Sequence, residues 1–105
     1  MNGLLLILSE AQGERFAAAV ELAASTAALG RPVAVLLRGP AAKALGHPAV
    51  AGALDLLFEL GADVGICQTA MAAHGLTAAD LPGGVEAHGM VGFLSGRADW
   101  QIVLV

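Results

Sequence analysis

Residues 63–74 read DVGICQTAMAAH, and this stretch decides the fold class. Its first part, from Asp63 to Ile66, is a short run typical of a buried strand. Cys67 ends that strand, and residues 68–74 predict the helix that follows. A strand that passes directly into a helix is the repeating unit of α/β proteins, in which helices cover both faces of a parallel sheet.

The same alternation of strand and helix runs along the rest of the chain. Gly30, Gly61 and the segment Pro82 to Gly84 are predicted to end helices. The predicted strands are 4–8, 33–37, 63–66, 85–87 and 100–105, and the predicted helices are 14–29, a turn at 41–45, 49–60, 68–74, a short helix after Thr77, and 88–95. We therefore expect residues 1–105 to form a single domain with a three-layer α/β/α architecture and a parallel sheet of about five strands, flavodoxin-like in architecture.

In such sheets, ligands bind beyond the carboxyl ends of the strands. On the predicted order of elements, this edge of the sheet collects Ser9, Glu10, the segment 38–47, Cys67 and His88. The carboxyl edge is therefore where we expect a functional site.

The composition favours self-association. Hydrophobic residues make up 57% of the chain and charged residues 13%, against roughly 45–50% and about 25% in average domains. The predicted helix 49–60 is apolar over a wide arc, and no helix follows the last strand to cover it. Because monomers rarely expose large apolar patches, we expect a homo-oligomer.

Charge and hydropathy exclude several classes of protein. The net charge is −4 and the five basic residues are scattered, so direct nucleic-acid binding is not expected. No apolar run approaches the roughly 18–20 residues of a membrane span, and the N-terminus lacks the pattern of a secretory signal. A single unpaired cysteine fits a reducing compartment. These features predict a cytoplasmic protein without a membrane segment.

Cys67 is the only cysteine and the leading candidate for a catalytic residue. At the start of a helix it would lie beside unpaired backbone N–H groups and the positive end of the helix dipole. Both favour the thiolate, which is the reactive form of cysteine. The alternative is that Cys67 only fills space, since free cysteine is often buried in protein cores.

The remaining candidates surround Cys67 in the predicted fold. Gln68 and Thr69 open the helix after it, and His47 and His88 lie in predicted loops that would border it; these four are the expected binding or supporting residues. His74 is predicted to cap the end of the same helix. No pair of histidine and cysteine residues has the close spacing of a zinc site, so we expect no metal and no organic cofactor.

Residues 61–76, GADVGICQTAMAAHGL, resemble the DsrE/DsrF/TusD-like sulfur-relay family, and the similarity extends through Gly84-Val85-Glu86 and the segment 88–96. In the first half, Ala28 to Val33 and the Ala-rich helix before it agree with the same family. The resemblance implies a DsrE-like fold with a five-stranded parallel sheet, assembled as trimers or hexamers. It also implies that Cys67 carries sulfur as a persulfide, in a sulfurtransferase-like relay between donor and acceptor proteins that serves sulfur oxidation or tRNA thiolation.

Three functions remain open from the sequence. The first is a persulfide carrier that uses Cys67. The second is a non-catalytic DsrE-like subunit or scaffold in which Cys67 is structural. The third is a small-molecule or redox-responsive binding module that uses the same edge of the sheet.

Overall fold

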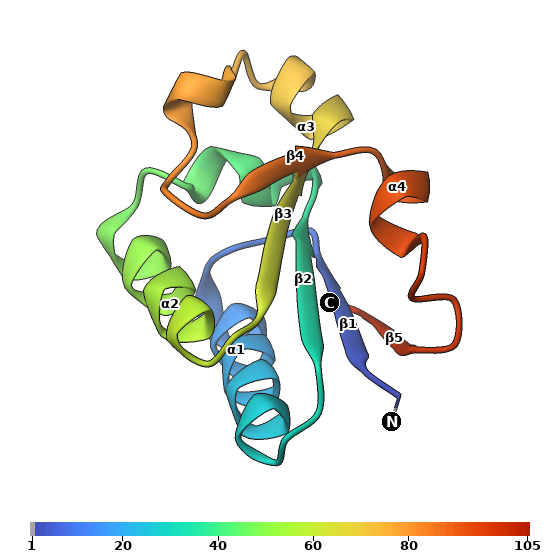
Figure 1. Cartoon of the computed structure of the whole chain (residues 1–105). Helices are drawn as coiled ribbons and strands as arrows, with labels where there is room; N and C mark the ends of the chain where they lie inside the picture. Colours follow the sequence, from blue (N-terminus) through green and yellow to red (C-terminus); the bar gives the residue numbers. More distant parts are fainter. Residues whose placement is uncertain (1) are drawn as a thin grey trace.

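In the computed structural model, which describes residues 2–105, five parallel strands form one sheet in the order β4-β3-β2-β1-β5 (Figure 1). The strands are β1 (Leu4–Leu8), β2 (Val33–Leu37), β3 (Asp63–Cys67), β4 (Glu86–His88) and β5 (Gln101–Leu104). The helices are α1 (Gly13–Ala28), α2 (Pro48–Glu59), α3 (Gln68–Ala73) and α4 (Met90–Leu94), with short 3₁₀ helices η1 (Gly39–Ala44) and η2 (Ala78–Asp80). The predicted parallel five-stranded sheet is confirmed.

The larger core lies between the sheet and helices α1 and α2. Successive side chains of a strand point to opposite faces, and alternate residues of the central strands enter this core: Leu4, Leu6 and Leu8 of β1, and Val33, Val35 and Leu37 of β2. Phe16 of α1 and Leu54 and Leu57 of α2 meet them. Helices α1 and α2 each begin and end within one residue of the predicted bounds, because their apolar residues face a large buried surface. Gly30, with φ +85°, follows the end of α1 as predicted.

The opposite face of the sheet is covered more thinly. Its core consists of Leu5 and Ile7 of β1, Ala34 and Leu36 of β2, and Phe93 of α4. Met90, Leu94 and Trp100 pack around the edge of this cluster. Figure 1 shows α4 alone on this side, with α1 and α2 on the other. The five-residue helix α4, together with Trp100, therefore covers the centre of this face.

The prediction of a helix over residues 88–95 is wrong at its start. His88 is the last residue of β4, where it pairs with Cys67 of β3. The helix begins only at Met90, after Gly89, and ends at Leu94. Pairing with β3 determines this boundary, because backbone hydrogen bonds to a neighbouring strand override a weak local preference for helix. The fourth strand is accordingly Glu86–His88, one residue later than predicted.

The last strand, β5, forms an exposed edge of the sheet. It pairs with β1 on one side, and Ile102 and Leu104 remain 45% and 76% exposed. Other large apolar side chains are also exposed on the isolated chain: Leu22, Leu29, Leu56, Leu60 and Val91. In the described part of the chain, no helix is both long enough and apolar enough to cross a membrane.

Candidate functional site

Cys67 stands at the junction of β3 and α3, on the carboxyl edge of the sheet. It is the last residue of the strand and the N-cap of the helix, with an extended backbone (φ −66°, ψ 128°). The residue is half-buried, and its side chain packs in part against the larger core. The first N–H groups of a helix have no partner within the helix, so Cys67 lies beside backbone donors and within reach of solvent. Ala70 and Met71 anchor α3 to the larger core and so fix this junction.

His88 and Gln68 are the predicted site residues that the fold brings to Cys67. The register of β3 and β4 makes Cys67 and His88 direct neighbours. Gln68 begins α3, and its Oε1 atom lies 3.8 Å from where a Cβ on Gly89 would stand. Thr69 follows in the first turn of α3 and is exposed. Cys67, Gln68 and His88 therefore form one group, which we call the β3–β4 junction.

His47 lies elsewhere. It is the N-cap of α2 and borders a pocket of about 380 Å³ together with Glu10 and Lys43. The pockets that His47 borders are lined by the segment between β1 and α1, by η1 and by α2, and not by Cys67 or His88. His47 is exposed, and neither Cys67 nor His88 lines the pockets that it borders, so its place beside Cys67 stays a prediction. We leave His47 out of the proposed site.

His74 is the C-cap of α3, as predicted. Its backbone N–H donates to the carbonyls of Ala70 and Met71. It therefore closes the far end of the helix that begins after Cys67. Within residues 2–105, no three His, Cys, Asp or Glu side chains lie close enough together to hold a metal ion.

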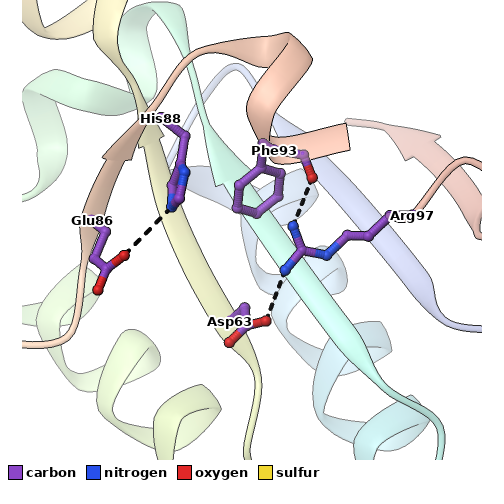
Figure 2. A network of polar contacts seen from close by, with 5 residues as sticks. All are labelled: Asp63, Glu86, His88, Phe93 and Arg97. Carbon is purple, nitrogen blue, oxygen red and sulfur yellow. Dashed lines mark hydrogen bonds and ion pairs between the residues drawn. The ribbon is translucent and has the colours of Figure 1, made fainter. Parts of the chain in front are cut away.

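A polar network next to the β3–β4 junction was not anticipated from the sequence (Figure 2). Arg97 Nη2 donates to Asp63 Oδ2 at 2.8 Å, and Arg97 Nη1 donates to the carbonyl oxygen of Phe93 at 2.6 Å. His88 Nε2 lies 3.8 Å from Glu86 Oε2, too far for a direct hydrogen bond. The rings of His88 and Phe93 meet edge to face, with centroids 5.3 Å apart.

Arg97 also stacks on aromatic rings. Its guanidinium carbon lies 4.6 Å from the centroid of Phe93 and 5.3 Å from that of Trp100. Arg97 and Asp63 are 34 residues apart in the chain, so no local pattern links them. The one signal in the sequence was that Arg97 follows Phe93 by four residues, one helical turn.

The network surrounds a pocket of about 320 Å³ at the β3–β4 edge. A Cβ on Gly65 would stand 2.8 Å from both His88 Cδ2 and Phe93 Cε1. Only a glycine at this position of β3 therefore lets the two rings approach the strand. The pocket is lined by Phe58, Ala62, Asp63, Val64, Gly84, Glu86, His88, Phe93 and Arg97.

Comparison with known proteins identifies the fold. Three solved structures share it over nearly their whole length. MTH1491 of Methanobacterium thermoautotrophicum, a protein of unknown function, matches with a TM-score of 0.84 and 18% sequence identity over 100% of both chains. The ychN protein of E. coli gives a TM-score of 0.79 at 18% identity, covering 99% of this chain and 98% of its own. BT1422 of Bacteroides thetaiotaomicron, a conserved protein of unknown function, gives 0.78 at 17% identity, with coverages of 97% and 94%.

No protein-family model matches the chain, and no curated protein matches its sequence. At identities of 17–18% the three structures establish the architecture alone. A function for this chain must therefore be argued from its own residues.

Proposed function

We propose that this protein is a persulfide carrier of a sulfur relay, with Cys67 as the residue that holds the sulfur. The observation that carries the proposal is the place of Cys67: a half-buried free thiol at the carboxyl edge of a parallel sheet and at the N-cap of a helix. Ligands of such sheets bind at this edge, and the first backbone N–H groups of α3 have no partner within the helix and can donate to a sulfur bound there. The resemblance of residues 61–76 to the DsrE/DsrF/TusD-like family supports the same function.

The chemistry needs one nucleophilic sulfur and no cofactor. The Cys67 thiolate attacks the terminal sulfur of a donor persulfide R–S–SH. A new S–S bond forms at Cys67, the S–S bond of the donor breaks, and the donor leaves as the thiolate R–S⁻ and takes its electron pair. Cys67 is then Cys–S–SH, and an acceptor thiolate removes the terminal sulfur by the same exchange in reverse.

The neighbours of Cys67 suit this exchange. His88 pairs with Cys67 across the strands, and its side chain is 35% exposed. Its ring packs edge to face against Phe93, and the strand pairing fixes the backbone of Cys67 and His88 at this edge of the sheet. Gln68 and Thr69 are exposed at the start of α3, where they can contact a donor or acceptor protein. A carrier that must keep its thiol reduced between transfers belongs in a reducing compartment such as the cytoplasm.

Loading with sulfur tests the proposal directly. After incubation with a persulfide donor, intact-protein mass spectrometry is expected to show a gain of one sulfur atom, and peptide mapping should place it on Cys67. The Cys67→Ser variant should show no gain, because a serine hydroxyl does not attack a persulfide under these conditions. Dithiothreitol should remove the added sulfur from the wild-type protein and release it as sulfide.

The fold of the variant is the necessary control. Cys67→Ser replaces a half-buried sulfur by oxygen, so its circular dichroism spectrum and urea midpoint should be measured beside the wild-type values. A folded wild-type protein that gains no sulfur would favour the scaffold function. Loss of folding or of assembly in Cys67→Ser would show that the thiol is structural.

The exposed apolar surface supports self-association as the second part of the proposal. Leu22 of α1 and Leu104 of β5 border a shallow, mostly apolar groove of about 420 Å³, together with Arg15, Ala18, Ala19 and Val105. In the described sheet, β5 is the last strand and its outer edge is unpaired; such edges readily pair with another chain. We propose that a second copy of the chain covers the surface formed by β5 and Leu22. The family resemblance implies a trimer or a hexamer.

Sedimentation velocity is expected to give a multiple of the monomer mass of 10.5 kDa at micromolar concentration. Leu104→Glu should shift the protein toward monomer, because it places a charge in the covered surface. Leu29→Glu is the matched control: Leu29 is as exposed as Leu104, at 80% against 76%, but lies at the far end of α1. A wild-type monomer, or equal effects of the two substitutions, would contradict the proposed surface.

A further inference from the structure

The pocket at the β3–β4 edge is separate from the thiol of Cys67, which does not line it. It lies over the first residues of β3, beside the start of β4, which is only three residues long. Figure 2 shows Asp63, Glu86, His88, Phe93 and Arg97 around one space beside β3. A volume of about 320 Å³ lies at the lower end of the range of about 300–1,000 Å³ found for small-molecule sites.

Arg97 provides a fixed cationic wall. Two of its N–H groups donate to Asp63 and to the Phe93 carbonyl, and its plane lies against two aromatic rings. These contacts hold the guanidinium in one orientation before any ligand arrives, which lowers the entropic cost of binding. A guanidinium has five N–H donors. Within residues 2–105, only the two described have a protein acceptor, so donors remain for a ligand carboxylate.

The anionic side of the pocket is exposed to solvent. Glu86 is 80% exposed and makes only the long contact of 3.8 Å with His88. The second oxygen of Asp63 is free of the Arg97 hydrogen bond, and the side chain is 70% exposed. Either carboxylate can accept hydrogen bonds from an ammonium group of a ligand.

The charged residues that line the pocket determine which ligands fit it. A simple anion would meet the carboxylates of Glu86 and Asp63, and a simple amine would meet the guanidinium of Arg97. A small molecule that carries both a carboxylate and an ammonium group satisfies both sides. The rings of Phe58 and Phe93 and the side chains of Ala62 and Val64 complete the wall with apolar surface, which suits an apolar side chain.

We infer that this pocket binds a free α-amino acid with an apolar side chain. Its carboxylate lies against Arg97, its ammonium group against Glu86, and its side chain against Phe58. Gly65 lets the rings of His88 and Phe93, which line the pocket, approach β3, because a Cβ there would crowd both rings. The inference does not depend on whether Cys67 carries sulfur.

A titration with L-leucine, followed by the amide signals of the ¹⁵N-labelled protein, tests this site. We expect saturable shifts at Gly65, Glu86 and Arg97, with a dissociation constant of about 1 mM. N-acetyl-L-leucine, which lacks the ammonium charge, and L-leucinamide, which lacks the carboxylate, should each bind about tenfold more weakly. Both capped compounds keep the apolar side chain, so they separate the contribution of charge from that of apolar contact.

Glu86→Gln should weaken leucine binding about tenfold and leave N-acetyl-L-leucine unchanged. Because Glu86 is exposed, the substitution should not disturb the fold. Glu10→Gln is the matched control, since it removes a carboxylate from the pocket beside His47 instead, and it should leave binding unchanged. Equal binding of leucine and its two capped forms, shifts confined to the pocket beside His47, or no shift at tens of millimolar would overturn the inference.

Discussion

Replacing Phe93 with alanine is expected to lower the free energy of unfolding by about 3–5 kcal/mol, the usual cost of removing a buried phenylalanine ring. Phe93 is 1% exposed and is the only fully buried residue of α4. It fills the thin core between α4 and the sheet, where Leu5, Ile7 and Leu36 meet its ring. Among the helices of residues 2–105, only α4 contributes to this core, so the cavity cannot close by a small shift of a second helix.

Removing the Phe93 ring should also weaken the polar network, because the ring contacts both His88 and Arg97. Domains of this kind are stable by about 5–15 kcal/mol in total, so the variant should lose a large share of its stability and unfold at a clearly lower urea concentration. Urea denaturation followed by circular dichroism measures the change. Val91→Ala, on the same helix but 86% exposed, should change stability by less than about 0.5 kcal/mol. A cost for Phe93→Ala below about 1 kcal/mol would show that α4 does not close the core as described.

Gly65→Ala is expected to destabilise the protein by about 1–3 kcal/mol, although alanine is normally the better residue in a strand or helix. The new methyl group would stand 2.8 Å from His88 Cδ2 and from Phe93 Cε1. The half-exposed His88 can move away, but the buried ring of Phe93 cannot do so without opening its core. The same displacement should also reduce the volume of the pocket at the β3–β4 edge.

Gly52→Ala provides a control of opposite sign. Gly52 lies inside α2, is exposed, and has no heavy atom within 4 Å of its would-be Cβ. Alanine there should raise the free energy of unfolding by about 0.5–1 kcal/mol, the ordinary gain for glycine to alanine within a helix. Chemical denaturation of both variants under the same conditions gives the comparison. A stabilising effect of Gly65→Ala would mean that His88 and Phe93 lie farther from β3 than described.

Most of the fold could be predicted because its signals are local. The runs Leu4–Leu8 and Val33–Leu37 are continuous and apolar, as expected of central strands buried on both faces. Gly30 and Gly61 were predicted to end helices, and they follow the ends of α1 and α2. The weaker prediction was the segment 85–95, where three-residue β4 and five-residue α4 are too short to show a period.

The candidate site was predictable only in part. Cys67 could be placed at a strand end and a helix start, because both elements are continuous in sequence around it. Its neighbour His88 was expected in a loop and is instead in β4, since strand pairing, not local sequence, fixes that residue. His47 was expected near Cys67 and lies with Glu10 and Lys43, because the direction of a loop depends on what it packs against.

The sequence by itself determined the alternation of strands and helices, the parallel sheet, and the place of its single thiol at the carboxyl edge. These features follow from apolar runs and helix boundaries, and each of those patterns can be recognised from a few consecutive residues. Only the tertiary structure decided that β5 lies beside β1, that Cys67 is paired with His88, and that Arg97 reaches Asp63 across 34 residues to line a pocket. The physical reason is that such contacts depend on strand pairing and side-chain packing between distant segments. These interactions do not produce a periodic pattern of apolar residues in the sequence.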